Sequence, residues 1–243
     1  MKKALVLSLA AAMLLGLTAC GGKDNAAKKS EGVMTYAEYE AAALDSEVTV
    51  ETYVQNKQGW WEDKATLYTQ DEEGAYFIYN MPISQEDYDK LVPGTKIKVK
   101  GYKTEWSGEI EIADATFEVE EGSFIATAED VTAKLGSEDL IKSQNKFVSF
   151  KDLTVVARQD ANGNDVAFQY NWDGSGEPGS DLYFDVESNG QTYTFTVESY
   201  LTGKDTDVYK AIEGINIGDK IDCEGFLYWY NGVNPHITNV TVK

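Results

Sequence analysis

The sequence has one histidine, one arginine and two cysteines among 243 residues, and each scarcity limits the chemistry it can support. Hydrolases with an activated Ser or Cys usually need a histidine base. The single histidine, His236, follows Pro235 at the start of the predicted last strand, where an ordinary half-exposed strand residue is expected. We therefore expect a protein that is not an enzyme and has no catalytic residues.

Positive charge is also scarce. The 21 Lys and Arg residues face 41 Asp and Glu residues, which gives a formal net charge of −20. Nucleic-acid affinity comes largely from Lys and Arg that neutralise phosphates. The charge therefore argues against nucleic acid as a partner.

The N-terminus combines Lys2 and Lys3 with an apolar run that is too short to span a bilayer and ends at Leu17-Thr18-Ala19-Cys20. It resembles the lipobox of bacterial lipoproteins, in which the cysteine is diacylated and becomes the first mature residue. The resemblance implies a signal peptide at 1–19, a lipid on Cys20 and an exported protein anchored to the outer face of the bacterial cytoplasmic membrane. The alternative is an ordinary cleaved signal with an incidental cysteine.

Cleavage after residue 19 would have three consequences for the mature chain. Its formal charge would become −22, because two lysines and no acid are lost. Residues 20–33 are small and polar and predict a flexible tether. With Cys20 lipidated, Cys223 has no partner for an intramolecular disulfide.

A strand-turn-strand unit occurs twice. GTKIKVKGYKTEWSGEIEI at 94–112 corresponds to GDKIDCEGFLYWYNGVNPHI at 218–237, with glycines seven residues apart in both copies. Trp106 of the first copy matches Tyr230 of the second. This duplication predicts two modules, at 34–121 and 127–243.

Both modules show the same order of predicted elements. In the first, a capping box at Thr35 begins a helix, strands follow at 47–55, 64–70 and 75–80, a helix spans 84–91, and a hairpin covers 95–106 and 109–119. The second has a helical lead-in at 127–143, a strand at 146–157, a long loop at 158–180, strands at 181–187 and 191–198, a helix near 205–213 and a hairpin at 219–230 and 233–242.

Three strands, a helix and two strands is the order of the oligonucleotide/oligosaccharide-binding fold, the OB-fold. Both modules resemble it, and 94–112 is similar to the closing hairpin of the anticodon-binding type of that superfamily. The whole chain resembles bacterial lipoproteins with tandem OB-folds. The resemblance implies a mainly β protein with two five-stranded barrels, each with a short helix between its third and fourth strands and a helical lead-in.

Metal and thiol chemistry have weak support. Residues 160–165 resemble the start of a calcium loop, but the twelfth position is Asn171, where an EF-hand needs a bidentate Glu. A hydrophilic turn is the simpler interpretation, although the acids of the 158–180 loop also offer oxygen ligands to calcium. Cys223 lies in a predicted strand at a position whose side chain should face the core, so a buried and unreactive thiol is expected. We expect no metal and no cofactor.

Aromatic residues provide the candidate site. OB-folds usually bind ligands on the outer face of strands 2 and 3 and in the loops that join strands 1 to 2 and 4 to 5. These positions predict seven ligand-binding residues: Trp60, Trp61, Tyr68, Trp106, Trp172, Tyr183 and Tyr230. The alternative is that the rings seal the barrel ends.

Three functions follow from this pattern. The main prediction is a surface-anchored, non-catalytic binding module for a glycan, peptide or protein. One alternative is an adaptor in a membrane-bound complex, and a further one is an extracellular single-stranded nucleic-acid binder. The sequence leaves the oligomeric state open.

Overall fold

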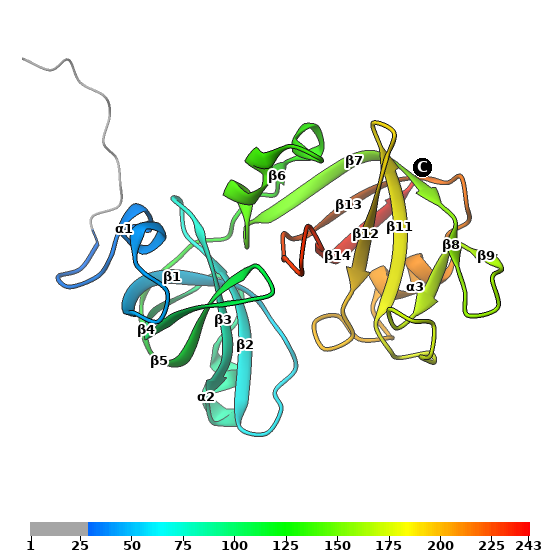
Figure 1. Ribbon diagram of the computed structural model, residues 1–243. Helices are drawn as coiled ribbons and strands as arrows, with labels where there is room; N and C mark the ends of the chain where they lie inside the picture. Colours follow the sequence, from blue (N-terminus) through cyan, green and yellow to red (C-terminus); the bar gives the residue numbers. More distant parts are fainter. Residues whose placement is uncertain (1–28) are drawn as a thin grey trace, which may run out of the picture.

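A computed structural model describes residues 29–243, which form two β-rich halves packed side by side (Figure 1). The predicted signal peptide at 1–19, the lipidation site Cys20 and most of the predicted tether lie outside the described residues. Within residues 29–243, no helix is both long and apolar enough to cross a membrane. The prediction of a mainly β protein is confirmed.

The first half contains a closed five-stranded barrel in which the strands neighbour one another in the order β1-β2-β3-β5-β4. β1 pairs with both β2 and β4, and β3 pairs in parallel with β5. With a helix between β3 and β4, this is the OB-fold topology that the sequence predicts. The elements are α1 (Tyr36–Ala41), β1 (Glu47–Lys57), β2 (Lys64–Gln70), β3 (Ala75–Pro82), α2 (Gln85–Lys90), β4 (Thr95–Trp106) and β5 (Glu109–Ser123).

Caps explain the two short helices of this half. Thr35 and Glu38 form the predicted capping box of α1, and the Ser84 hydroxyl accepts from the Asp87 amide at the start of α2. α1 ends at Ala41, because the chain becomes extended at Ala42. The buried Lys103 ammonium of β4 donates to three carbonyls at this helix end, which holds α1 against the barrel.

The second half has a seven-stranded sheet in the order β10-β11-β12-β14-β13-β7-β6, and β11 also pairs with β7. A separate pair, β8 and β9, lies beside it. The elements are β6 (Glu129–Asp130), η1 (Thr132–Lys134), η2 (Glu138–Ser143), β7 (Phe147–Val156), β8 (Arg158–Gln159), β9 (Asp165–Val166), β10 (Phe168–Tyr170), β11 (Leu182–Ser188), β12 (Gln191–Val197), α3 (Asp207–Glu213), β13 (Lys220–Phe226) and β14 (His236–Val242).

Two sequence predictions need correction in this half. The lead-in at 127–143 is not one helix, because Gly136 takes a φ of +80° and divides the segment into two 3₁₀ turns. The closing hairpin has a longer loop than predicted, since β13 ends at Phe226 and β14 begins only at His236. This longer loop carries Tyr230.

The repeated glycine within each fourth strand has a packing reason. A Cβ on Gly101 would lie 2.7 Å from the Ala113 carbonyl oxygen, and one on Gly225 would lie 2.2 Å from the His236 carbonyl oxygen. Strand register shifts at both positions, as at a β-bulge. The duplication therefore preserves a point where two backbones approach closely.

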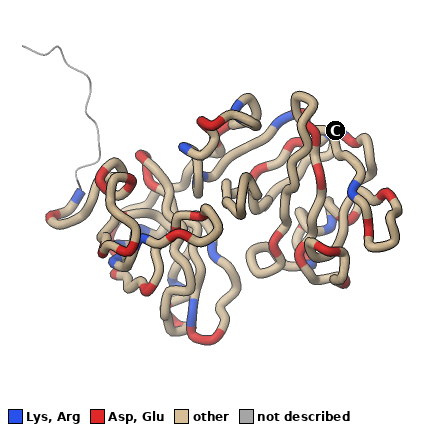
Figure 2. The backbone as a smooth tube through the Cα atoms, viewed as in Figure 1, with Lys and Arg blue, Asp and Glu red and all other residues tan. Residues whose placement is uncertain are grey.

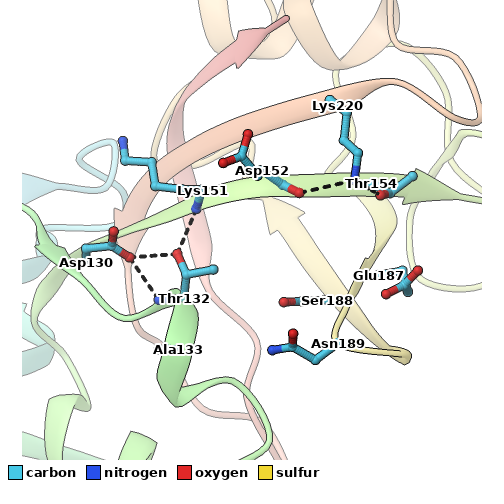
Figure 3. A pocket seen from close by; sticks show the side chains of 10 residues that line it. All are labelled: Asp130, Thr132, Ala133, Lys151, Asp152, Thr154, Glu187, Ser188, Asn189 and Lys220. Atoms are coloured by element: carbon cyan, nitrogen blue, oxygen red, sulfur yellow. Dashed lines mark hydrogen bonds between the residues drawn. The ribbon is translucent and has the colours of Figure 1, made fainter.

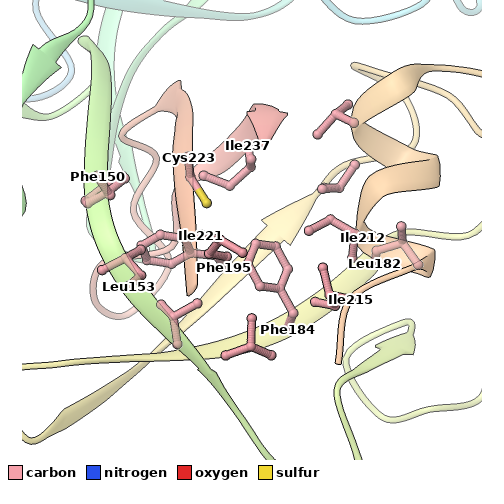
Figure 4. Close-up of a cluster of buried hydrophobic side chains, with 14 of the residues drawn as sticks. Phe150, Leu153, Leu182, Phe184, Phe195, Ile212, Ile215, Ile221, Cys223 and Ile237 are labelled. Carbon is pink, nitrogen blue, oxygen red and sulfur yellow. The ribbon is translucent and has the colours of Figure 1, made fainter. Parts of the chain in front are cut away.

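Each half has its own hydrophobic core, and a third cluster joins the halves. Figure 4 shows the core of the second half, with Cys223 buried as predicted among aliphatic and phenylalanine side chains. The joining cluster consists of Tyr68 and Phe77 from the first half and Phe226 and Tyr228 from the second. The rings of Tyr68 and Phe226 stack with their centroids 4.6 Å apart. The halves are therefore held together by buried aromatic packing as well as by the connecting chain.

Candidate functional site

The candidate site is a groove of about 590 Å³ where the two halves meet, which we call the aromatic groove. Seven of its thirteen lining residues carry aromatic rings of Phe, Tyr or Trp, and both halves contribute. The lining residues are Gln58, Phe77, Tyr79, Trp106, Trp172, Asp181, Tyr183, Thr196, Glu198, Tyr228, Tyr230, Asn234 and His236.

Strand alternation places the rings of the first half. On β3, Tyr76 and Ile78 belong to the barrel core, so Phe77 and Tyr79 lie on the opposite face. The Phe77 and Tyr79 rings are stacked at 28° with centroids 6.4 Å apart. Neither residue was among the seven predicted from the sequence, although the period-two pattern of 75–80 contains the signal.

The matching positions of the two repeats meet at the groove. Trp106 ends β4 and Tyr230 lies in the β13–β14 loop, and their ring centroids are 5.2 Å apart. The two loops are also joined by a hydrogen bond from the Asn231 amide to the Ser107 carbonyl oxygen. Both rings stay about half exposed, with exposed fractions of 53% and 49%. They can therefore contact a ligand without first leaving the core.

Four of the seven predicted residues line this groove: Trp106, Trp172, Tyr183 and Tyr230. Trp172 is 72% exposed. Tyr183 of β11 is half-buried, and burial raises its pKa to about 12. The structure thus assembles into one groove the rings that the sequence had assigned to two separate modules.

The other three predicted residues lie elsewhere. Trp60 packs against the core of the first half, and its indole N–H donates to the Ile83 carbonyl oxygen at 3.1 Å. Trp61 is exposed and lines a neighbouring hollow. Tyr68 was wrongly assigned to a solvent-facing surface, because the second half covers that face of β2 and leaves the side chain fully buried.

The polar groups of the groove are mainly neutral at pH 7, and none of its lining residues is Lys or Arg. Burial and the nearby Asp181 charge raise the pKa of Glu198 to about 8, so this carboxyl is largely protonated. The Gln58 amide donates to Glu198 Oε2 at 2.9 Å across the two halves. Asp181 accepts from the Ser199 amide and hydroxyl.

His236 also lines the groove and differs from the half-exposed residue that the sequence predicts. Its ring stacks on Tyr228 at 23° with centroids 4.2 Å apart, and its Nδ1 lies 2.6 Å from the Tyr68 hydroxyl. Burial lowers the pKa of His236 to about 3, so the imidazole is neutral. Flat rings beside neutral donors and acceptors suit the faces and edges of a planar, polar ring ligand.

A larger hollow of about 730 Å³ lies on the second half (Figure 3). It is open and lined by charged and small polar side chains, several of which bond to one another. Lys220 donates to the Thr154 hydroxyl at 2.6 Å, and Asp130 accepts from the Thr132 amide and hydroxyl. With several of its polar groups already hydrogen-bonded and no aromatic ring among its lining residues, this hollow is a weaker candidate than the aromatic groove.

Residues 160–165, which resemble the start of a calcium loop, form a turn whose carboxylate bonds to its own amides. The Asp160 carboxylate accepts from the backbone amides of Asn162 and Asn164 and from the Asn164 side chain. Across residues 29–243, no group of three or more His, Cys, Asp or Glu side chains is placed to hold a metal ion.

Comparison with protein-family models finds no match, and neither does comparison with curated protein sequences. Among solved structures, the chain is similar to a murine DNA-binding protein bound to double-stranded DNA, at 12% identity over 80% of this chain and 94% of the other, with a TM-score of 0.39. It is also similar to the Ifi202 HINa domain in complex with double-stranded DNA, at 11% identity over 83% of this chain and 97% of the other, with a TM-score of 0.36. A Replication Protein A heterotrimer bound to single-stranded DNA is similar at 12% identity over 84% of this chain and 51% of the other, with a TM-score of 0.32.

These comparisons correct two predictions. The sequence predicted a glycan, peptide or protein ligand and made nucleic acid an unlikely partner, whereas the similar structures are DNA-binding proteins and their DNA complexes. Net charge describes the whole chain, whose acids are scattered over both halves (Figure 2), whereas the groove has two carboxyls, one of them largely neutral at pH 7. At such low similarity, a ligand for this chain has to be argued from its own groove.

Proposed function

We propose that this protein is a non-catalytic binder of single-stranded nucleic acid, with unpaired bases stacked in the aromatic groove. The observation that carries the proposal is the gathering of rings from both halves into one groove, with Trp106 and Tyr230 at its exposed part. Stacking on aromatic side chains contributes about 1–3 kcal/mol per base and tolerates any sequence, because every base has a π-face. A duplex hides these faces, so the ligand has to be single-stranded.

We propose in addition that the second half is an OB-fold barrel of the same kind as the first. The pairings of β7 with β11, β11 with β12, β12 with β14, β14 with β13 and β13 with β7 return to the starting strand. This order matches β1-β2-β3-β5-β4 in the first half. The aromatic groove then lies between two barrels of a duplicated domain.

The acidic surface implies an unusual mode of binding. Proteins that neutralise phosphates release counterions, so their affinity falls steeply with salt. Because the groove has no Lys or Arg lining residue, we expect base stacking to supply the affinity and the phosphates to stay in solvent. Binding should then change little between about 50 and 200 mM salt, whereas six to ten phosphate contacts would cost roughly 10³–10⁵ in affinity over this range.

The test is a fluorescence anisotropy titration of labelled oligo(dT) with the protein, beside an abasic oligonucleotide of equal length. We expect oligo(dT) to bind and the abasic strand to bind much more weakly. Tyr230→Ala and Trp106→Ala should each weaken oligo(dT) binding about 5- to 150-fold, the range that corresponds to 1–3 kcal/mol.

Tyr102→Ala is the matched control for Tyr230→Ala, because Tyr102 is similarly exposed, at 44% against 49%, and lies outside the groove lining. It should leave binding unchanged. Equal affinity for the oligo(dT) and abasic strands, or no binding of either at low salt, would refute the proposal.

We also propose the location that the lipobox resemblance implies, with Cys20 lipidated and the protein held at the outer face of the cytoplasmic membrane. The lipobox residues Leu17-Thr18-Ala19-Cys20 support this proposal. Cys20→Ser should release the protein from the membrane fraction and change its mature size. Unchanged membrane association and size would contradict the anchor.

A further inference from the structure

His236 is the only histidine of the chain and lies where the groove meets the joining cluster. It is 7% exposed, and Pro235 precedes it at the start of β14. Nδ1 pairs with the Tyr68 hydroxyl, but Nε2 forms no hydrogen bond with any residue of the described chain. Nε2 is also not among the fully enclosed polar atoms that lack a partner. This nitrogen is therefore accessible from the groove.

The hydrogen bond between Tyr68 and His236 has a direction that burial determines. Tyr68 is 1% exposed, its hydroxyl lies 2.6 Å from His236 Nδ1, and the Gln58 side-chain amide donates toward the same hydroxyl oxygen. Burial keeps the hydroxyl protonated, since it raises the pKa of Tyr68 well above its usual value. If Nδ1 carried the hydrogen and donated, the Tyr68 hydroxyl hydrogen would be buried without an acceptor, which is strongly disfavoured. The Tyr68 hydroxyl therefore donates to Nδ1.

A neutral imidazole carries one N–H hydrogen. The hydrogen bond made by one ring nitrogen therefore determines whether the other nitrogen is protonated. With Nδ1 accepting from Tyr68, the hydrogen lies on Nε2. The stacking of His236 on Tyr228 fixes the ring plane as well. The floor of the groove thus presents one N–H donor in a fixed direction.

We propose that Tyr68 is a positioning residue that holds His236 as the Nε2–H tautomer, and that this N–H donates to an acceptor atom on the edge of a base in the aromatic groove. The proposal rests on the proposed function for its ligand, although the tautomer belongs to the free protein. The acceptor is a carbonyl oxygen of thymine, cytosine or guanine, or a ring nitrogen of adenine. Asn234 adds a second donor on the same segment, because the Thr196 hydroxyl occupies its Oδ1 at 2.8 Å and leaves its amide hydrogens available.

The single histidine allows a direct test. Protein labelled with ¹⁵N-histidine has one pair of ring nitrogen signals, whose chemical shifts identify the tautomer. We expect a protonated Nε2 and an unprotonated, hydrogen-bonded Nδ1 in the free protein. Tyr68→Phe should move both signals toward a mixture of tautomers while the backbone amide spectrum stays that of the folded protein, which distinguishes this change from unfolding. A protonated Nδ1 in the unaltered protein would overturn the proposal, whatever Tyr68→Phe does to folding.

Binding provides the second measurement. Tyr68→Phe should weaken oligo(dT) binding roughly 3- to 10-fold, the range typical of one net hydrogen bond. Tyr193→Phe is the control, because it removes a hydroxyl that bonds Gln191 away from the groove. Oligo(dT) should also shift the Nε2–H signal of the unaltered protein, and an unshifted signal on binding would refute the contact with the base. If oligo(dT) did not bind at all, the proposed function would fail, while the tautomer measurement would still decide the role of Tyr68.

Discussion

Glu109 provides the most demanding test of how the two halves are held together. It is the first residue of β5, it is fully buried, and Oε2 accepts from the Trp229 amide at 2.8 Å and from the Gln144 side chain at 3.2 Å, both in the second half. Its Oε1 and the Oδ1 of Asn145 are buried without hydrogen-bond partners in the described chain. Donors on Trp229, Asn145 and Gln144 favour the charged carboxylate, and burial of the carboxyl opposes them more strongly.

The same burial raises the pKa of Glu109 from 4.5 to about 8. An acid whose pKa is raised by folding stabilises the folded state fully below the unfolded pKa, and this contribution is lost as the pH rises through the folded value. The pKa difference corresponds to about 5 kcal/mol at 1.36 kcal/mol per unit. Of this, about 3–4 kcal/mol of the free energy of unfolding should disappear between about pH 5 and 8.

Glu109→Gln removes the ionisation and keeps a side chain of nearly the same shape whose carbonyl oxygen can still accept hydrogen bonds. Urea unfolding followed by tryptophan fluorescence from pH 5 to 8 should show a smaller loss for this variant than for the parent. Glu198, whose pKa is also raised to about 8, adds a loss of the same sign. His236, whose pKa is lowered to about 3, contributes a gain of opposite sign as the pH rises toward its unfolded value of 6.5. Between about pH 6.5 and 8, where only the two acids contribute, the variant should reduce the pH slope by about half rather than abolish it. Glu105→Gln, an exposed position on the neighbouring strand, is the control. Parallel pH curves for the parent and Glu109→Gln would refute the protonated interface.

Three further predictions follow from burial and backbone geometry. Trp60→Ala should lower the free energy of unfolding by about 3 kcal/mol, because the ring packs on the core and its indole N–H donates to the Ile83 carbonyl oxygen. Trp61 is 66% exposed, so Trp61→Ala should change the free energy of unfolding by no more than ~0.5 kcal/mol. A larger loss for Trp61→Ala than for Trp60→Ala in urea unfolding would contradict this assignment. Gly225→Ala should lower the free energy of unfolding by about 3 kcal/mol in the same assay, because its Cβ would meet the His236 carbonyl oxygen. At Gly214 an added Cβ would make only ordinary contacts, so Gly214→Ala should lower it little. Equal effects of the two substitutions would rule out the close backbone approach at Gly225. In a Cys20→Ser background, Cys223 should resist thiol reagents until the protein unfolds, because burial raises the pKa of this thiol; rapid labelling of the native protein would contradict the packing.

The sequence by itself determined the features that depend on neighbours along the chain. Thr35 and Ser84 identify helix starts because a cap acts within three residues. The duplicated glycines at 101 and 225 identify equivalent strands, and the order of elements identifies the OB topology of the first half. The predicted parity of Cys223 was correct because strand alternation is local.

Only the tertiary structure decided where the candidate binding surface lies. Strand parity correctly placed Tyr68 outside its own barrel, but it could not indicate that the second half covers this face and buries it. Phe77 and Tyr79 became groove residues because the second half supplies the opposite wall, and Trp106 meets Tyr230 although the two are far apart in sequence. Net charge likewise could not describe the groove. The net charge is a sum over all residues and does not say where each charge lies. The packing of the halves determines which acids face the groove, and burial there raises the pKa of Glu198.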